Sequence, residues 1–136
     1  MMRFADTNVL LYSISRAPAE LTKRERAEAV IDGGDICLSV QVLQEFYVQA
    51  THPRRKDALT HEQAAGFVHA WGRFPVQEMT LAILQSSLDT KERFRISYWD
   101  AAVIEAARAR GCQELLSEDL QHGQDFNGVR VVNPFL

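Results

Sequence analysis

The opening residues Met2-Arg3-Phe4-Ala5-Asp6-Thr7-Asn8-Val9-Leu10 place a short apolar stretch, an acidic residue and a second apolar stretch in succession. Residues 2–5 are predicted to form a short buried strand, and residues 9–15 a short helix. Brief apolar stretches that are also predicted to be strands recur at residues 35–38, 74–76, 114–116 and 129–132. Because helices are expected between them, the sequence predicts a three-layer α/β/α sandwich with a mainly parallel central sheet.

The predicted helices occupy most of the chain between these strands. They are expected at residues 20–31, ending at Gly33-Gly34; at 40–50, capped by Ser39; at 61–71; at 80–94, opened by Thr80; and from a Ser97 cap to Gly111. The chain contains no internal repeat, low-complexity tract or flexible linker, and 136 residues are the usual size of one domain. We therefore expect a single domain over residues 1–136.

The composition argues against several classes of protein. Apolar residues make up 46% and charged residues 24% of the chain, which is typical of globular proteins and not of disordered or fibrous ones. The longest apolar run near the start, residues 9–12, is too short to cross a bilayer, and no signal-peptide pattern precedes it. Cys37 and Cys112 lie far apart without a metal-type pairing, so both are expected as core residues of a protein in the reduced cytoplasm.

The net charge of −3 and the pI near 5.8 bear on nucleic-acid binding. A protein that holds nucleic acid by charge alone is expected to be strongly basic. If this chain acts on nucleic acid, another source of positive charge has to lie at the phosphate, and a divalent metal is the first candidate.

Four acidic residues are predicted to lie near one edge of the sheet. Asp6 directly follows the first strand, and Asp119 follows the strand at 114–116 by a short turn. If these strands are parallel neighbours, both carboxylates reach the same edge. Glu45 lies at the edge of the apolar face of its helix, and Asp100 falls within a core-facing stripe. A carboxylate on such a stripe costs desolvation free energy, which a bound cation offsets.

Each of these acids also has a purely structural explanation. Asp6 could cap the first helix, and Asp100 matches a capping box with Ser97. Glu45 is compatible with a solvated helix surface, and Asp119 with a turn. Taken singly, the structural explanation is the more frequent one, but four acids at the expected edge favour a common site.

Four segments resemble, in order and spacing, the four motifs of PIN-domain nucleases. They are FADTNVL at residues 4–10, VLQEF at 42–46, YWDAA at 98–102 and LSEDL at 116–120. The resemblance covers the whole chain and is strongest to VapC-type toxins of type II toxin–antitoxin systems. It implies a PIN-like fold, endonucleolytic hydrolysis of RNA phosphodiester bonds, a cognate antitoxin protein and a homodimer. The last motif departs from the pattern, because Ser117 stands where Thr is frequent, although the hydroxyl is kept.

Clustered carboxylates suit Mg²⁺ or Mn²⁺, which prefer hard oxygen ligands. The expected metal-binding and catalytic acids are Asp6, Asp100, Glu45 and Asp119. The residues expected to hold these carboxylates or the substrate by hydrogen bonds are Thr7, Asn8 and Ser117. Glu118 and Asp125 are open alternatives to Asp119.

Basic residues that are candidates for contacts with the RNA backbone fall into two groups. They are Arg54, Arg55 and Lys56 in one loop, and Arg93 and Arg95 before the helix that carries Asp100. The basic residues Lys23, Arg24 and Arg26 are interleaved with acids and are expected to be solvated surface.

Other functions compete with this prediction. A catalytically silent RNA-binding module on the same fold would not require all four acids. An aspartyl-phosphate phosphatase would need a second Asp two residues after Asp6, where the chain has Asn8. A receiver domain would need an acidic pair at the first strand end and a Lys after a late strand, and neither is evident. We therefore favour a metal-dependent ribonuclease.

Overall fold

Strands of one sheet alternate with helices along the chain in a computed structural model that describes residues 1–136. The strands are β1 (Arg3–Ala5), β2 (Ile36–Ser39), β3 (Val76–Gln77), β4 (Glu114–Leu116), β5 (Asp125–Phe126) and β6 (Val129–Val132). The helices are α1 (Thr7–Ser13), α2 (Leu21–Asp32), α3 (Val40–Ala50), α4 (His61–Trp71), α5 (Leu81–Phe94) and α6 (Tyr98–Ala109), with a 3₁₀ turn η1 (Pro18–Glu20) before α2.

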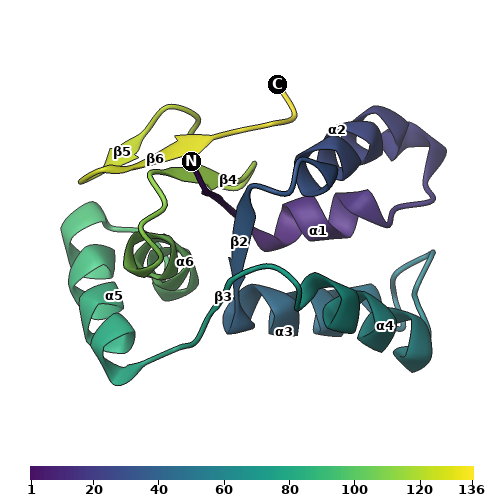
Figure 1. Cartoon of the computed structure of the whole chain (residues 1–136), viewed down its shortest axis with the longest axis horizontal. Helices are drawn as coiled ribbons and strands as arrows, with labels where there is room; N and C mark the ends of the chain where they lie inside the picture. Colours follow the sequence, from purple (N-terminus) through teal and green to yellow (C-terminus); the bar gives the residue numbers. More distant parts are fainter.

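The sheet has six strands in the order β3-β2-β1-β4-β6-β5. The pairs β3–β2, β2–β1, β1–β4 and β4–β6 are parallel, and only the edge strand β5 is antiparallel to its neighbour. Figure 1 shows α5 and α6 on one side of the sheet and α1 to α4 on the other. The predicted α/β sandwich with a mainly parallel sheet is therefore confirmed, and β1 lies between β2 and β4 near its centre.

A single core of 26 buried residues joins the layers. The strands are short, and most of their fully buried residues are apolar, as expected where helices cover both faces of a parallel sheet. Phe4 of β1 and Phe46 of α3 are fully buried. Cys37 is 0% exposed and Cys112 is 2% exposed. The expectation that Cys37 and Cys112 are core residues is thus confirmed.

The predicted helix caps are also present. Ser39, Thr80 and Ser97 each accept a hydrogen bond from a backbone N–H three residues later, at 3.2, 3.1 and 3.0 Å. None of the helices is both long enough and apolar enough to cross a membrane.

Two local predictions need correction. The first helix begins at Thr7 and not at residue 9, because the Asp6 carboxylate accepts the Thr7 N–H at 2.7 Å and caps it. Strand β5 was not predicted, although Asn127-Gly128 is a sequence signal for a two-residue hairpin. Both turn residues have positive φ, 53° and 101°, and the hairpin joins β5 to β6.

Leu10 on α1 provides a test of this core. Its side chain is fully buried, so Leu10→Ala should lower the free energy of unfolding by about 2–5 kcal/mol. The matched control Leu88→Ala removes a side chain that is 53% exposed on α5, and should change it by no more than about 0.5 kcal/mol. Urea denaturation measures both values, and equal losses would contradict the packing described.

Candidate active site

The pairing of β1 with β4 fixes the position of Asp6. Ala5 is in register with Leu116, and the Asp6 N–H donates to the Leu116 carbonyl at 3.0 Å. The next residues on the two strands, Asp6 and Ser117, are therefore neighbours. The Ser117 hydroxyl donates to Asp6 Oδ2 at 2.8 Å, while the Thr7 N–H donates to Oδ1. Both carboxylate oxygens of a nearly buried aspartate are thus held by hydrogen bonds.

No cation neutralises this buried carboxylate. Asp6 is 5% exposed, and none of the chain's ion pairs involves it. Burial raises the pKa of Asp6 to about 7. The hydrogen bonds from Ser117 and Thr7 lower the pKa in part, and the negative charges of Asp119 and Glu45 raise it further. At neutral pH the site therefore favours either a proton or a positive ion next to Asp6.

Glu45 reaches the same region from α3. Its Oε2 accepts the Thr7 hydroxyl at 3.0 Å, and its Oε1 accepts Gln41 Nε2 at 2.9 Å. Gln41 Nε2 also donates to the Trp99 carbonyl at 3.3 Å, which joins α3 to the start of α6. Sequence reasoning missed Gln41, although its place one helical turn before Glu45 was a usable signal.

Asp119 is the exposed acid of the group and lies beyond the end of β4. Asn8 Nδ2 donates to Asp119 Oδ2 at 3.2 Å and to the Ser117 hydroxyl at 3.3 Å. The Asp119 N–H donates to the same hydroxyl at 3.1 Å. Ser117 thus connects Asp6, Asn8 and Asp119 through one oxygen atom.

Asp100 lies in the first turn of α6. Its N–H donates to the Ser97 hydroxyl, but the return bond from the Ser97 N–H that a capping box requires is absent. Desolvation raises the pKa of Asp100, the Ser97 hydroxyl lowers it, and the charges of Asp119 and Glu45 raise it. The Asp100 carboxylate therefore feels the same negative field as Asp6, and it forms no ion pair.

The alternatives to Asp119 are engaged elsewhere. Glu118 accepts the Tyr12 hydroxyl, and Lys23 Nζ pairs with its other oxygen at 2.9 Å. Lys23 was expected to be solvated surface; its side chain is 42% exposed and also pairs with Glu118. Asp125 accepts the Gly128 N–H in the β5–β6 turn at the sheet edge. These contacts favour Asp119 as the fourth acid.

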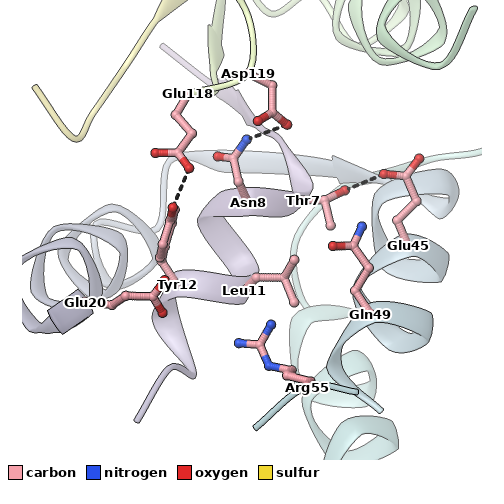
Figure 2. Close-up of a pocket in the computed structure, with 10 residues that line it drawn as sticks. All are labelled: Thr7, Asn8, Leu11, Tyr12, Glu20, Glu45, Gln49, Arg55, Glu118 and Asp119. Atoms are coloured by element: carbon pink, nitrogen blue, oxygen red, sulfur yellow. Dashed lines mark hydrogen bonds between the residues drawn. The ribbon is translucent and has the colours of Figure 1, made fainter. Parts of the chain in front are cut away.

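An open pocket of about 290 Å³ lies over this network. Figure 2 shows Thr7, Asn8, Glu45 and Asp119 on one part of its wall, with Arg55 facing them from the loop after α3. Arg55 Nε lies 3.0 Å from an Asp57 carboxylate oxygen. The other predicted phosphate contacts, Arg54, Lys56, Arg93 and Arg95, are exposed and do not line the pocket.

The residues present fit a hard divalent cation by their chemistry. Asp6, Glu45, Asp100 and Asp119 supply carboxylate oxygens, two of them carry raised pKa values, and none has a basic partner. As the side chains lie in this structure, no group of three or more His, Cys, Asp or Glu residues is arranged to hold a metal. Binding would therefore require these side chains to draw closer together.

Comparisons with known proteins agree with the fold. The family model described as PIN domain matches residues 3–124. A toxin–antitoxin complex from Klebsiella pneumoniae has a similar fold, with a TM-score of 0.69 and 19% identity, covering 97% of each chain. VapC20 from Mycobacterium tuberculosis, described as a sarcin–ricin loop cleaving toxin, has a TM-score of 0.66 and 17% identity over 85% of this chain and 90% of its own. DNA-bound VapBC from Salmonella typhimurium has a TM-score of 0.65 and 19% identity, over 96% and 97%. A comparison with curated protein sequences finds no match.

The raised pKa of Asp6 predicts how the free energy of unfolding of the metal-free protein changes with pH. Between about pH 4, near the ordinary pKa of 3.8, and about pH 7, the folded state keeps a proton on Asp6 that the unfolded state loses. The contribution of Asp6 to the free energy of unfolding therefore falls as the pH rises through this window, by up to about 1.4 kcal/mol per pH unit.

Asp6→Asn keeps a side-chain acceptor for the Thr7 N–H and removes this titration. In EDTA, the difference in unfolding free energy between Asp6→Asn and wild type should shift in favour of the variant as the pH rises from about 4.5 to about 7.5. Urea denaturation at several pH values measures it. Parallel pH profiles of the two proteins would show that the Asp6 pKa is ordinary.

Proposed function

The chain belongs to the PIN domain family, and we propose that it is a metal-dependent endoribonuclease that acts as the toxin of a type II toxin–antitoxin pair. The observation that carries the proposal is Asp6, a nearly buried carboxylate with no basic partner at the carboxyl end of a parallel strand. Such a position is where α/β sheets build their sites, and the missing countercharge is what a divalent cation supplies.

Mg²⁺ or Mn²⁺, held by Asp6, Asp100, Glu45 and Asp119, would activate a water and stabilise charge on the leaving oxygen. The chain's own residues perform the remaining tasks. Ser117 and the Thr7 N–H fix both oxygens of Asp6, and Asn8 orients Asp119 through Oδ2. The other oxygen of Asp119, Oδ1, makes no hydrogen bond in the chain and can accept the proton of the attacking water.

Arg55 is the basic residue placed to contact the substrate. It lines the same pocket as Glu45 and Asp119, and its guanidinium can hold a phosphate oxygen on the side away from the acids. Arg54, Lys56, Arg93 and Arg95 lie outside this pocket, so we assign them at most to the flanking backbone of the RNA.

The proposed partners follow from the resemblance and from the names of the structural neighbours, several of which are toxin–antitoxin complexes. We propose a cognate antitoxin protein as the inhibitor, a homodimer as the assembly, and the cytoplasm as the location. A catalytically silent RNA-binding module is the second candidate, but it offers no reason to keep four unpaired acids together at a cost in stability.

Substitution of the acids tests the catalytic proposal. Asp6→Asn and Asp100→Asn should each reduce RNA cleavage by at least about 100-fold, because each removes a charge that holds the cation. Gel assays of a labelled RNA in Mg²⁺ or Mn²⁺ measure the rate, and EDTA should abolish the wild-type activity.

Asp125→Asn is the matched control for these variants. Asp125 is an acid of the edge strand β5, so its replacement should leave cleavage within about 2-fold of wild type. Full activity in EDTA, or in Asp100→Asn, would contradict the metal mechanism.

Expression in a bacterial host tests the proposed biological role. Wild-type protein produced without an antitoxin should slow growth. Asp6→Asn at an equal protein level should not slow it, because the growth effect and RNA cleavage are proposed to depend on the same carboxylate. Growth curves with protein levels matched by immunoblotting measure it. Equal harmlessness of the two proteins would refute the toxin role and leave the nuclease activity to be judged by the cleavage assay.

A further inference from the structure

Trp99 is an unusually exposed aromatic residue beside the proposed active site. It is 63% exposed, whereas Trp71, the other tryptophan of the chain, is 4% exposed in the core. It directly precedes Asp100 on α6. An exposed indole next to Asp100, one of the proposed metal-binding acids, offers a flat apolar surface that a ligand can cover.

The Trp99 side chain is held in place without being covered. Its carbonyl accepts the hydrogen bond from Gln41 Nε2, which ties this part of α6 to α3. Its ring packs edge to face with Tyr98, at 5.1 Å between ring centroids and 78° between planes. The backbone and one ring edge are therefore fixed before any ligand arrives, which lowers the entropic cost of binding on the ring.

A hollow of about 350 Å³ lies between Trp99 and α3. It is lined by Gln41, Gln44, Glu45, Val48, Gln49 and Trp99. Glu45 and Gln49 also line the active-site pocket, so the two hollows are adjacent. A nucleotide next to the scissile phosphate can reach the hollow without leaving the site.

We propose that this hollow binds a nucleobase of the RNA substrate, which stacks on Trp99 next to the cleaved bond. Stacking on aromatic side chains is the usual way in which proteins hold unpaired bases. Gln44 and Gln49 are exposed, and neither side-chain amide makes a hydrogen bond within the chain, so both can bind the edge of the base. The inference rests on the proposed ribonuclease function.

The lining of the hollow favours a base over a phosphate. It contains no basic side chain, and its one charged residue, Glu45, is negative. Phosphates are instead expected beside Arg55 in the neighbouring pocket. The cationic side chain Arg55 therefore lies in one hollow, and the indole and the glutamine amides lie in the other.

A second copy of this chain is the competing occupant. Trp99 also borders a neighbouring hollow with the apolar side chains of Met79, Leu81 and Leu84, which a protein surface could cover. The unpaired amides of Gln44 and Gln49 and the position of the hollow next to the active-site pocket favour the base. The test must nevertheless distinguish the two occupants, and Leu81 allows this because it lines only the neighbouring hollow.

Tryptophan fluorescence of the full chain tests the proposal directly. Asp6→Asn prevents cleavage, and a short single-stranded RNA of mixed sequence is added in Mg²⁺. The RNA should quench the emission of Trp99, and a strand of equal length in which the bases are replaced by abasic sites should not. The double variant Asp6→Asn, Trp99→Phe reports the background from the buried Trp71.

Affinity measurements separate stacking from apolar packing. Trp99→Leu keeps an apolar side chain but removes the stacking surface, and should weaken RNA binding by about 5-fold or more. Trp99→Phe should retain most of the affinity, and Leu81→Ala should leave it unchanged. Size-exclusion chromatography of the same variants gives the oligomeric state.

The outcomes are distinct. Unchanged affinity in Trp99→Leu, no quenching by the RNA, or equal quenching by the abasic strand would overturn the proposal. Loss of the oligomer in Trp99→Leu and in Leu81→Ala, with RNA affinity intact, would assign the surface to a second copy and overturn it as well. If the RNA quenches Trp99 but the wild-type protein does not cleave RNA, the base-binding hollow is supported and the proposed ribonuclease function is refuted. If wild type and Trp99→Leu cleave RNA at equal rates, the ribonuclease function is supported and the base-binding hollow is refuted.

Discussion

The buried carboxylate of Asp6 is the constraint on which the site depends. The β1–β4 register brings Ser117 into contact with Asp6. Asp6 also caps the N-terminus of α1. The position of one carboxylate therefore sets the end of a strand, the start of a helix and the contact between two strand ends. Two hydrogen bonds offset only part of its desolvation, which is why its pKa is raised to about 7.

The other acids are placed by uncharged groups and not by ion pairs. Thr7 and Gln41 hold Glu45, and Asn8 holds Asp119. Basic partners are found instead for acids outside this group, such as Glu118 with Lys23. Hydroxyl and amide donors fix the orientation of a carboxylate while leaving its negative charge uncancelled. The fold thereby keeps a region of unbalanced charge, at the expense of stability, as functional sites commonly do.

The sequence predicted much of this arrangement because its signals are local. Strand β4 and helix α4 have the predicted boundaries, and Ser39, Thr80 and Ser97 cap the helices assigned to them. The Asn127-Gly128 turn was a local signal that was overlooked, whereas other misses depend on contacts between distant segments. Nothing near Glu118 in the sequence shows that Tyr12 and Lys23 lie beside it, and nothing near Arg55 distinguishes it from Arg54 and Lys56. Gln41 was missed for a different reason: its spacing from Glu45 was visible in the sequence, but its contact with the Trp99 carbonyl on α6 was not.

The sparse positive charge of the site bears on how an RNA would be selected. Electrostatic attraction gives affinity for any nucleic acid, but it carries no sequence information. In a chain of net charge −3 with Arg55 as the basic residue of its pocket, that general attraction is weak. For the proposed RNA substrate, binding energy would then come from a cation at the cleaved phosphate and from contacts with bases and with the shape of the strand. Because those contacts differ between RNAs whereas phosphates do not, weak general attraction favours a narrow choice of substrate.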